Sequence, residues 1–174
     1  METGVKRAPR LLPLASAVAL ACTPVAAQAG EKEDILAAAH AAFAPYMDEA
    51  AAATVPDWEL PIYSRGTAAL IARWAKGLSP DEVEDLNGFG WFCQCQDFDT
   101  AHFRVTLDAR YKPGASQATV AAQVNVGWDE TTLPNRLAMV REDGGWRIDD
   151  LFSESFPQGL KAALHKAVAE HAGR

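Results

Sequence analysis

The stretch Gly145-Trp146-Arg147-Ile148-Asp149-Asp150-Leu151 decides the fold class, because it is a strand pattern that directly follows a tight turn. Successive side chains of a strand point to opposite faces of the sheet, so Trp146, Ile148 and Asp150 are expected on one face. A carboxylate is therefore expected on an apolar face. It serves either a functional pocket or a structural partner, and the sequence leaves both interpretations open.

Three more segments with a two-residue period precede this strand. Apolar and polar residues alternate over 103–111 and 120–128, and another strand is expected over 136–142. Turn-forming links such as Lys112-Pro113-Gly114 and Asp143-Gly144-Gly145 join them. Strands joined by short links pair with their sequence neighbours, so a four-stranded antiparallel meander is expected.

Helical periodicity flanks the strands. Apolar residues recur at three- and four-residue steps over 31–53, with a break or kink expected at Pro45, and again over 67–76 and 160–172. A capping box at residues 79–82 predicts another short helical turn. Helices before and after a curved antiparallel meander predict an α+β fold, cone-like and formed as one domain over residues 30–174.

The connector at residues 54–64 cannot form a regular helix, because Pro56 and Pro61 each remove a backbone donor. Its remaining residues are largely apolar. We expect it to pack over an opening of the core.

Residues 1–29 have the three parts of a secretory signal peptide. Basic residues near the start precede an apolar run at 11–21, and Ala27-Gln28-Ala29 supplies a cleavage site before Gly30. A competing site is Ala19-Leu20-Ala21-Cys22, which is similar to a lipoprotein box and would leave a lipid anchor on Cys22. Both predict a periplasmic or secreted protein with no transmembrane span in the mature chain.

The charge of the chain argues against nucleic acid as a partner. The formal net charge is −7 at pH 7, and removal of residues 1–29 would make the rest more acidic still. An acidic surface without a Lys/Arg cluster repels phosphate backbones. A small apolar molecule or an envelope protein is the expected partner.

Two motifs some fifty residues apart carry a family resemblance. They are Phe92-Cys93-Gln94-Cys95-Gln96-Asp97-Phe98, with its Gln96-Asp97 pair, and the run from Trp146 to Asp150. Together with the order of elements, they resemble an uncharacterised bacterial envelope branch of the nuclear transport factor 2-like superfamily. The resemblance implies a bent sheet folded against helices around a pocket. The superfamily includes isomerases and dehydratases as well as proteins without known activity, so it does not assign chemistry.

Carboxylates are the candidate catalytic groups. With Asp149 as a further candidate, Asp150 could act as a base whose pKa is raised by burial, and Asp97 could supply a second carboxylate to divide the acid and base roles. The structural alternative is that both accept local backbone hydrogen bonds, the commoner use of short acids. Gln96 joins these two as a ligand-binding candidate because it belongs to the first motif.

Cys93 and Cys95 are the cysteines that remain after cleavage at Gly30. An oxidising compartment allows a disulfide between them, but a separation of two residues gives a tight ring that an extended backbone disfavours. Both the bonded and the free state remain open, and a redox role is conceivable. The nearby Asp97, Asp99 and His102 match no common zinc spacing, so no metal site and no cofactor are predicted.

Aromatic residues are candidates for the lining of a ligand cavity. Phe89 and Trp91 lie in a glycine-flanked loop and are expected at the pocket mouth. The expected function is therefore an exported domain that binds a small ligand or an envelope partner. The alternative is a pocket enzyme of the isomerase or hydrolase type with a buried Asp as general base.

Overall fold

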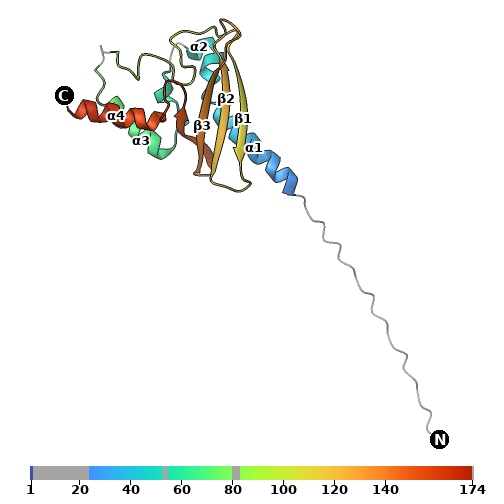
Figure 1. Ribbon diagram of the computed structural model, residues 1–174. Helices are drawn as coiled ribbons and strands as arrows, with labels where there is room; N and C mark the ends of the chain where they lie inside the picture. The colour runs from blue at the N-terminus through green and yellow to red at the C-terminus, as the bar shows by residue number, and fades with distance from the viewer. Residues whose placement is uncertain (2–23, 53–54, 80–82, 174) are drawn as a thin grey trace.

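The chain folds as an α+β protein with helices at both ends of a four-stranded antiparallel sheet, as predicted (Figure 1). The computed structural model describes residues 1, 24–52, 55–79 and 83–173. In chain order the elements are α1 Pro24–His40, η1 Ala44–Met47, α2 Glu49–Ala52, η2 Asp57–Glu59, α3 Arg65–Ala75, β1 Arg104–Tyr111, β2 Gln117–Asn125, β3 Leu133–Glu142, β4 Gly145–Phe152 and α4 Leu160–Ala172.

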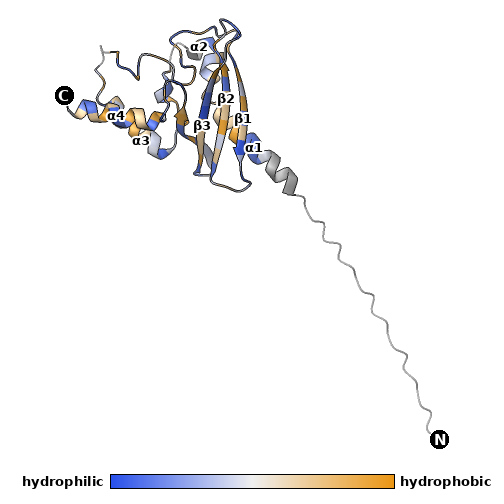
Figure 2. Ribbon diagram, in the orientation of Figure 1, coloured by the Kyte–Doolittle hydropathy of each residue, from blue (hydrophilic) through white to orange (hydrophobic). Residues whose placement is uncertain are grey.

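The sheet is an open meander of order β1-β2-β3-β4, which confirms the predicted topology. Helix α1 contacts all four strands, and α3 and α4 pack against each other beside β4 (Figure 1). In Figure 2, orange apolar residues lie in α1 next to the sheet and alternate with polar residues along the strands. One face of the sheet is therefore covered by helix and loop, while the other is mostly polar.

The core lies between α1 and the covered face of the sheet. Ile35 and Ala39 of α1 are fully buried, as are Val120 of β2 and Leu137 of β3. Helix α1 ends at His40, before Pro45, because proline cannot continue a helix. The helical break expected at Pro45 is thus confirmed.

A β-bulge in β4 overturns the expected orientation of Asp150. Met139 pairs with Ile148 but Ala138 pairs with Asp150, so Asp149 is an extra residue without a partner on β3. A bulge shifts the alternation by one position. As a result Leu151 is fully buried, and Asp150 does not follow Trp146 and Ile148 into the core.

The structure corrects one more sequence prediction, and two others fall largely outside the described residues. Trp128, predicted to face inward from the second strand, is 60% exposed because β2 ends at Asn125 and the chain turns at Gly127 with φ of 95°. Most of the predicted signal peptide, and residues 80–82 of the predicted capping box, lie outside the described residues. Within the described ranges, no helix has the length and apolarity needed to cross a membrane.

Candidate functional site

A buried carboxylate, Asp57, lies at the start of η2 inside the connector between the first helices and α3. The residue as a whole is only 7% exposed. One oxygen, Oδ2, accepts the hydroxyl of Tyr46 at 2.5 Å and the backbone N–H groups of Trp91 at 2.5 Å and Phe92 at 3.3 Å. Three segments of the chain thus converge on one oxygen atom.

Local backbone geometry places these groups. Pro56 is extended, with ψ of 149°, and leads into the short helical turn that begins at Asp57. The Tyr63 hydroxyl donates to the Asp57 carbonyl at 2.8 Å, which holds this turn from the other side. Gly90 fits because a Cβ there would lie 2.6 Å from both the Tyr46 hydroxyl and the Cys93 sulfur. A glycine is therefore required where the loop crosses the tyrosine.

Burial controls the electrostatics of this cluster. Desolvation raises the pKa of Asp57 above its ordinary value, although the hydrogen bonds from Tyr46, Phe92 and Trp91 oppose that shift. Desolvation and the neighbouring Asp57 also raise the pKa of Tyr46 and of Tyr63 well above 10.0. Both tyrosines therefore remain protonated hydrogen-bond donors at neutral pH.

A pocket of about 270 Å³ opens beside Asp57. Part of its wall consists of rings, contributed by Pro45, Pro56, Trp58, Phe89 and Phe98. The polar groups on the wall come chiefly from the Asp57 cluster and from the loop that carries the two cysteines. A concave wall that combines apolar rings with convergent polar groups is typical of small-molecule sites.

Cys93 and Cys95 form a disulfide on the wall of this pocket, with their Cα atoms 5.1 Å apart. The backbone is not extended between them, because Gln94 adopts a left-handed conformation with φ of 55°. The Gln94 side chain donates to Asn135 of β3 at 2.8 Å, and Asn135 donates to the Phe92 carbonyl at 2.6 Å. These bonds fasten the cysteine loop to the covered face of the sheet.

The structure places the three ligand-binding candidates Phe89, Trp91 and Gln96 in different environments. Gln96 is exposed and Phe89 half-buried, and both line the pocket. Trp91 is fully buried rather than at the pocket mouth, because its ring packs on Trp58 and its Nε1–H donates to the Leu86 carbonyl. Side chains that are close together in this loop therefore lie in different environments.

Asp97 and Asp150, two of the candidate catalytic acids, each accept hydrogen bonds from nearby backbone groups. Asp97 is exposed, and its carboxylate accepts the backbone N–H of Phe98 at 2.9 Å. Asp150 accepts the backbone N–H groups of Leu151 at 2.9 Å and Lys161 at 3.0 Å. The Lys161 N–H lies in the first turn of α4, so Asp150 caps that helix from the adjacent strand. Both acids have the backbone partners of the structural alternative.

The bulged residue, Asp149, joins α3 to α4. Its Oδ1 accepts the Ser64 hydroxyl at 2.7 Å and the Lys161 ammonium at 2.6 Å. Partial burial acts to raise the pKa of Asp149, but the hydrogen bonds from Lys161 and Ser64 and the charge of Lys161 hold it below the ordinary value. Ser64 also accepts the Thr67 N–H as the N-cap of α3. This acid is structural.

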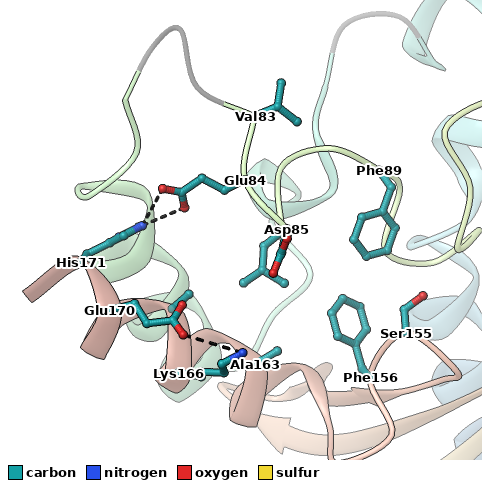
Figure 3. A pocket seen from close by; sticks show the side chains of 12 residues that line it. Val83, Glu84, Asp85, Phe89, Ser155, Phe156, Ala163, Lys166, Glu170 and His171 are labelled. Carbon is teal, nitrogen blue, oxygen red and sulfur yellow. Dashed lines mark hydrogen bonds and ion pairs between the residues drawn. The ribbon is translucent and has the colours of Figure 1, made fainter. Parts of the chain in front are cut away.

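A larger hollow of about 600 Å³ lies between α4 and residues 83–89 (Figure 3). In Figure 3, Glu84 faces His171, with Oε2 2.7 Å from Nε2, and Lys166 faces Glu170 at 3.7 Å. Glu84 and Lys166 therefore already have partners within the wall, while the Nδ1 of His171 is buried without one. Phe89 lines this hollow as well as the smaller pocket. We favour the smaller pocket as the site because only its wall contains a buried carboxylate.

Sequence reasoning missed Asp57 and Tyr46. A signal for Asp57 was present, because it is an acid between Pro56 and Trp58 in a connector predicted to be packed. Among the described residues, no three His, Cys, Asp or Glu side chains gather closely enough to hold a metal ion. Comparison of the chain with protein-family models, curated proteins and solved structures gives no match.

Proposed function

We propose that this protein is an exported single-domain protein that binds a small, mainly apolar ligand in the pocket beside Asp57. The observation that carries the proposal is the state of the Asp57 carboxylate. Its Oδ2 accepts three hydrogen bonds, whereas no described residue donates to Oδ1. Because Oδ1 is not among the fully buried side-chain atoms that lack a partner, it keeps some accessible surface, and a ligand N–H or O–H in the pocket can donate to it.

The shape and chemistry of the pocket define the ligand class. At about 270 Å³ it lies near the lower end of ligand-site volumes. The rings of Trp58, Phe89 and Phe98 favour a flat apolar body by van der Waals contact and stacking. The ligand is therefore a small aromatic or cyclic molecule with one hydrogen-bond donor for Asp57.

Export and family membership are part of the same proposal. Cleavage before Gly30 would keep Ile35 and Ala39, the residues with which α1 packs in the core. It would also keep Glu31, which accepts the backbone N–H of Gly114 at 3.0 Å. The helix-and-meander layout agrees with the proposed membership of the nuclear transport factor 2-like superfamily and with a periplasmic or secreted location. N-terminal mass analysis of the envelope protein distinguishes a chain that begins at Gly30 from one lipidated at Cys22.

A pocket enzyme is the second candidate, because the pKa of Asp57 is raised and Tyr46 donates a hydrogen bond to its carboxylate. A carboxylate that takes up a proton more readily than usual suits general base catalysis of isomerase or hydrolase type. In this candidate function the general base is Asp57, in place of Asp150 and Asp97, which have backbone partners. Product formation from a bound ligand, lost in Asp57→Asn, would establish it.

Binding can be tested with N-phenyl-1-naphthylamine, a fluorescent probe that has two aromatic ring systems joined by one N–H. We expect saturable fluorescence enhancement at one site. Gln96→Trp places a large side chain at the pocket wall and should weaken probe affinity at least tenfold. The matched control is Asp97→Trp, since Asp97 is also exposed and is adjacent but is not on the pocket wall.

Equal affinities of Gln96→Trp and Asp97→Trp would show that the probe binds elsewhere. Absence of saturable binding to the folded wild type would contradict the small-ligand proposal and favour an envelope protein as the partner. Native mass spectrometry of protein recovered from its own cells then identifies the natural ligand class.

A further inference from the structure

We propose that the Cys93–Cys95 disulfide is a thiol–disulfide exchange site, at which a small thiol attacks Cys95 and Cys93 is the leaving group. The assignment goes beyond ligand binding and does not depend on it. It rests on three features of the cysteine loop, which are the unequal burial of the two sulfurs, the groups around Cys93, and the way the loop is held.

The two cysteines differ in accessibility. Cys93 is fully buried, whereas Cys95 is half-buried, and both residues line the 270 Å³ pocket. An incoming thiolate must approach in line with the S–S bond, so access decides which sulfur is attacked. Of the two cysteines on the pocket wall, Cys95 is the one with exposed surface, so a small thiol should reach it more readily than Cys93.

The surroundings of Cys93 suit the reduced state as well. Its sulfur lies 3.6 Å from the Gly90 carbonyl oxygen and 3.5 Å from the Cys95 carbonyl oxygen. Once the disulfide is broken, the S–H of Cys93 can donate to either oxygen. The leaving thiol therefore has a hydrogen-bond acceptor in place before the reaction.

The loop is held by bonds that do not involve sulfur. The Gly90 N–H donates to the Cys95 carbonyl at 2.7 Å, and Asn135 holds the Phe92 carbonyl at 2.6 Å. The N–H groups of Trp91 and Phe92 are held by Asp57. A disulfide that spans two positions also removes little entropy from the unfolded chain. Reduction can therefore occur without unfolding.

The backbone conformation of Gln94 should make the disulfide easier to reduce. A non-glycine residue in the left-handed region is strained, and Gln94 has φ of 55° between the two cysteines. Opening the ring removes the covalent link across Gln94, which a hydrogen bond to Asn135 still holds in place. Stored strain at a disulfide makes it easier to reduce.

The exchange balances as two steps. A thiolate RS⁻ attacks the Cys95 sulfur, the S–S bond breaks, and its electron pair leaves with Cys93, which takes a proton from solvent. A second RS⁻ then attacks the R-group sulfur of the mixed disulfide and forms RSSR, while Cys95 leaves as a thiolate and is protonated by solvent. Two thiols are oxidised and one protein disulfide is reduced, and the reverse sequence oxidises the protein.

The first experiment measures reduction of the folded full-length chain by glutathione at several concentrations, with alkylation and tryptic mass mapping. Trypsin places Cys93 and Cys95 in the peptide 77–104 and Cys22 in the peptide 11–32, so the signals are separate. We expect the rate to rise in proportion to thiol concentration while the circular dichroism spectrum is retained. A rate that is independent of thiol concentration, or reduction only with loss of structure, would mark a structural disulfide and overturn the proposal.

The second experiment tests which sulfur is attacked. Oxidised glutathione should form a mixed disulfide with Cys95 in Cys93→Ala at least tenfold faster than with Cys93 in Cys95→Ala. Equal rates, or the opposite order, would overturn the assignment of Cys95. If either variant fails to fold, the concentration dependence measured on the wild type still decides whether exchange occurs in the native state.

Discussion

The Tyr46 hydroxyl donates to the Asp57 carboxylate at 2.5 Å, and this bond joins two short helical turns, η1 and η2. The Tyr46 ring also stacks on Phe103, at the entry to the sheet, with ring centroids 5.1 Å apart. The pair thus connects the core to the pocket wall. It also couples the stability of this region to the ionisation of Asp57.

Tyr46→Phe should destabilise the protein by about 1–3 kcal/mol at pH 7, because it removes a donor from a buried carboxylate. The Tyr46 hydrogen bond lowers the pKa of Asp57, so its loss raises that pKa further. The destabilisation should therefore be smaller at pH 4, where more of Asp57 is protonated. Urea unfolding at the two pH values measures it.

The control for this variant is Tyr63→Phe. Tyr63 donates to the backbone carbonyl of the same residue at 2.8 Å, not to its carboxylate. Its loss should cost about 1 kcal/mol at both pH values. If the two variants show the same pH dependence, the Tyr46 hydroxyl does not stabilise the ionised carboxylate.

Asp57→Asn should remove the pH-dependent destabilisation that the buried Asp57 causes in the wild type. Because the folded-state pKa of Asp57 is raised above 3.8, the native state binds more protons than the unfolded state between those two values. Wild-type stability relative to Asp57→Asn should therefore fall as pH rises from about 4 and level off above the folded-state pKa. If urea unfolding instead shows that the stability of the wild type relative to Asp57→Asn rises with pH, the hydrogen bonds to Asp57 outweigh its burial.

The sequence predicted the sheet better than the site, for a physical reason. Alternation over 103–142 is a local property of each strand, and it produced the strands and their order correctly. The bulge at Asp149 is not local, since it depends on which β3 residue pairs with Asp150. The burial of Asp57 likewise depends on Trp91, which is 34 positions away in the chain. Tertiary contacts of this kind leave no periodic signal.

Lys161→Met should lower stability by at most about 1 kcal/mol at pH 7, since the Lys161–Asp149 pair is partly exposed. The pKa of Asp149 is held below 3.8, so its contribution is present above that value and is lost as pH falls through the folded-state pKa. The effect of the substitution should therefore vanish in acid. Lys166→Met, which breaks a more exposed pair with Glu170, is the control and should have little effect at any pH.

Asp150→Ala should cost about 0.5–2 kcal/mol, because α4 loses the acceptor for the Lys161 N–H in its first turn. Asp150→Asn retains an acceptor oxygen and should cost less. Neither change should alter probe affinity in the pocket beside Asp57. Thermal melts together with probe titrations measure both effects, and a tenfold loss of probe affinity in folded Asp150→Asn would return Asp150 to the binding site.

Gly159→Ala should destabilise the protein more than Gly114→Ala. Both glycines have positive φ, 97° and 74°, so each substitution imposes backbone strain. A Cβ at Gly114 meets nothing within 4 Å, whereas one at Gly159 lies 2.5 Å from the Asp150 carboxylate. The difference between the two variants therefore combines the contact between Gly159 and the acid that caps α4 with the backbone strain at Gly159, whose φ of 97° and ψ of 152° suit glycine alone. We expect that difference to be about 1–2 kcal/mol in urea unfolding.

The difference between the two glycine variants should shrink in the background of Asp150→Ala, where the obstructing oxygen is gone. An unchanged difference in that background would mean that the cap and the glycine act independently.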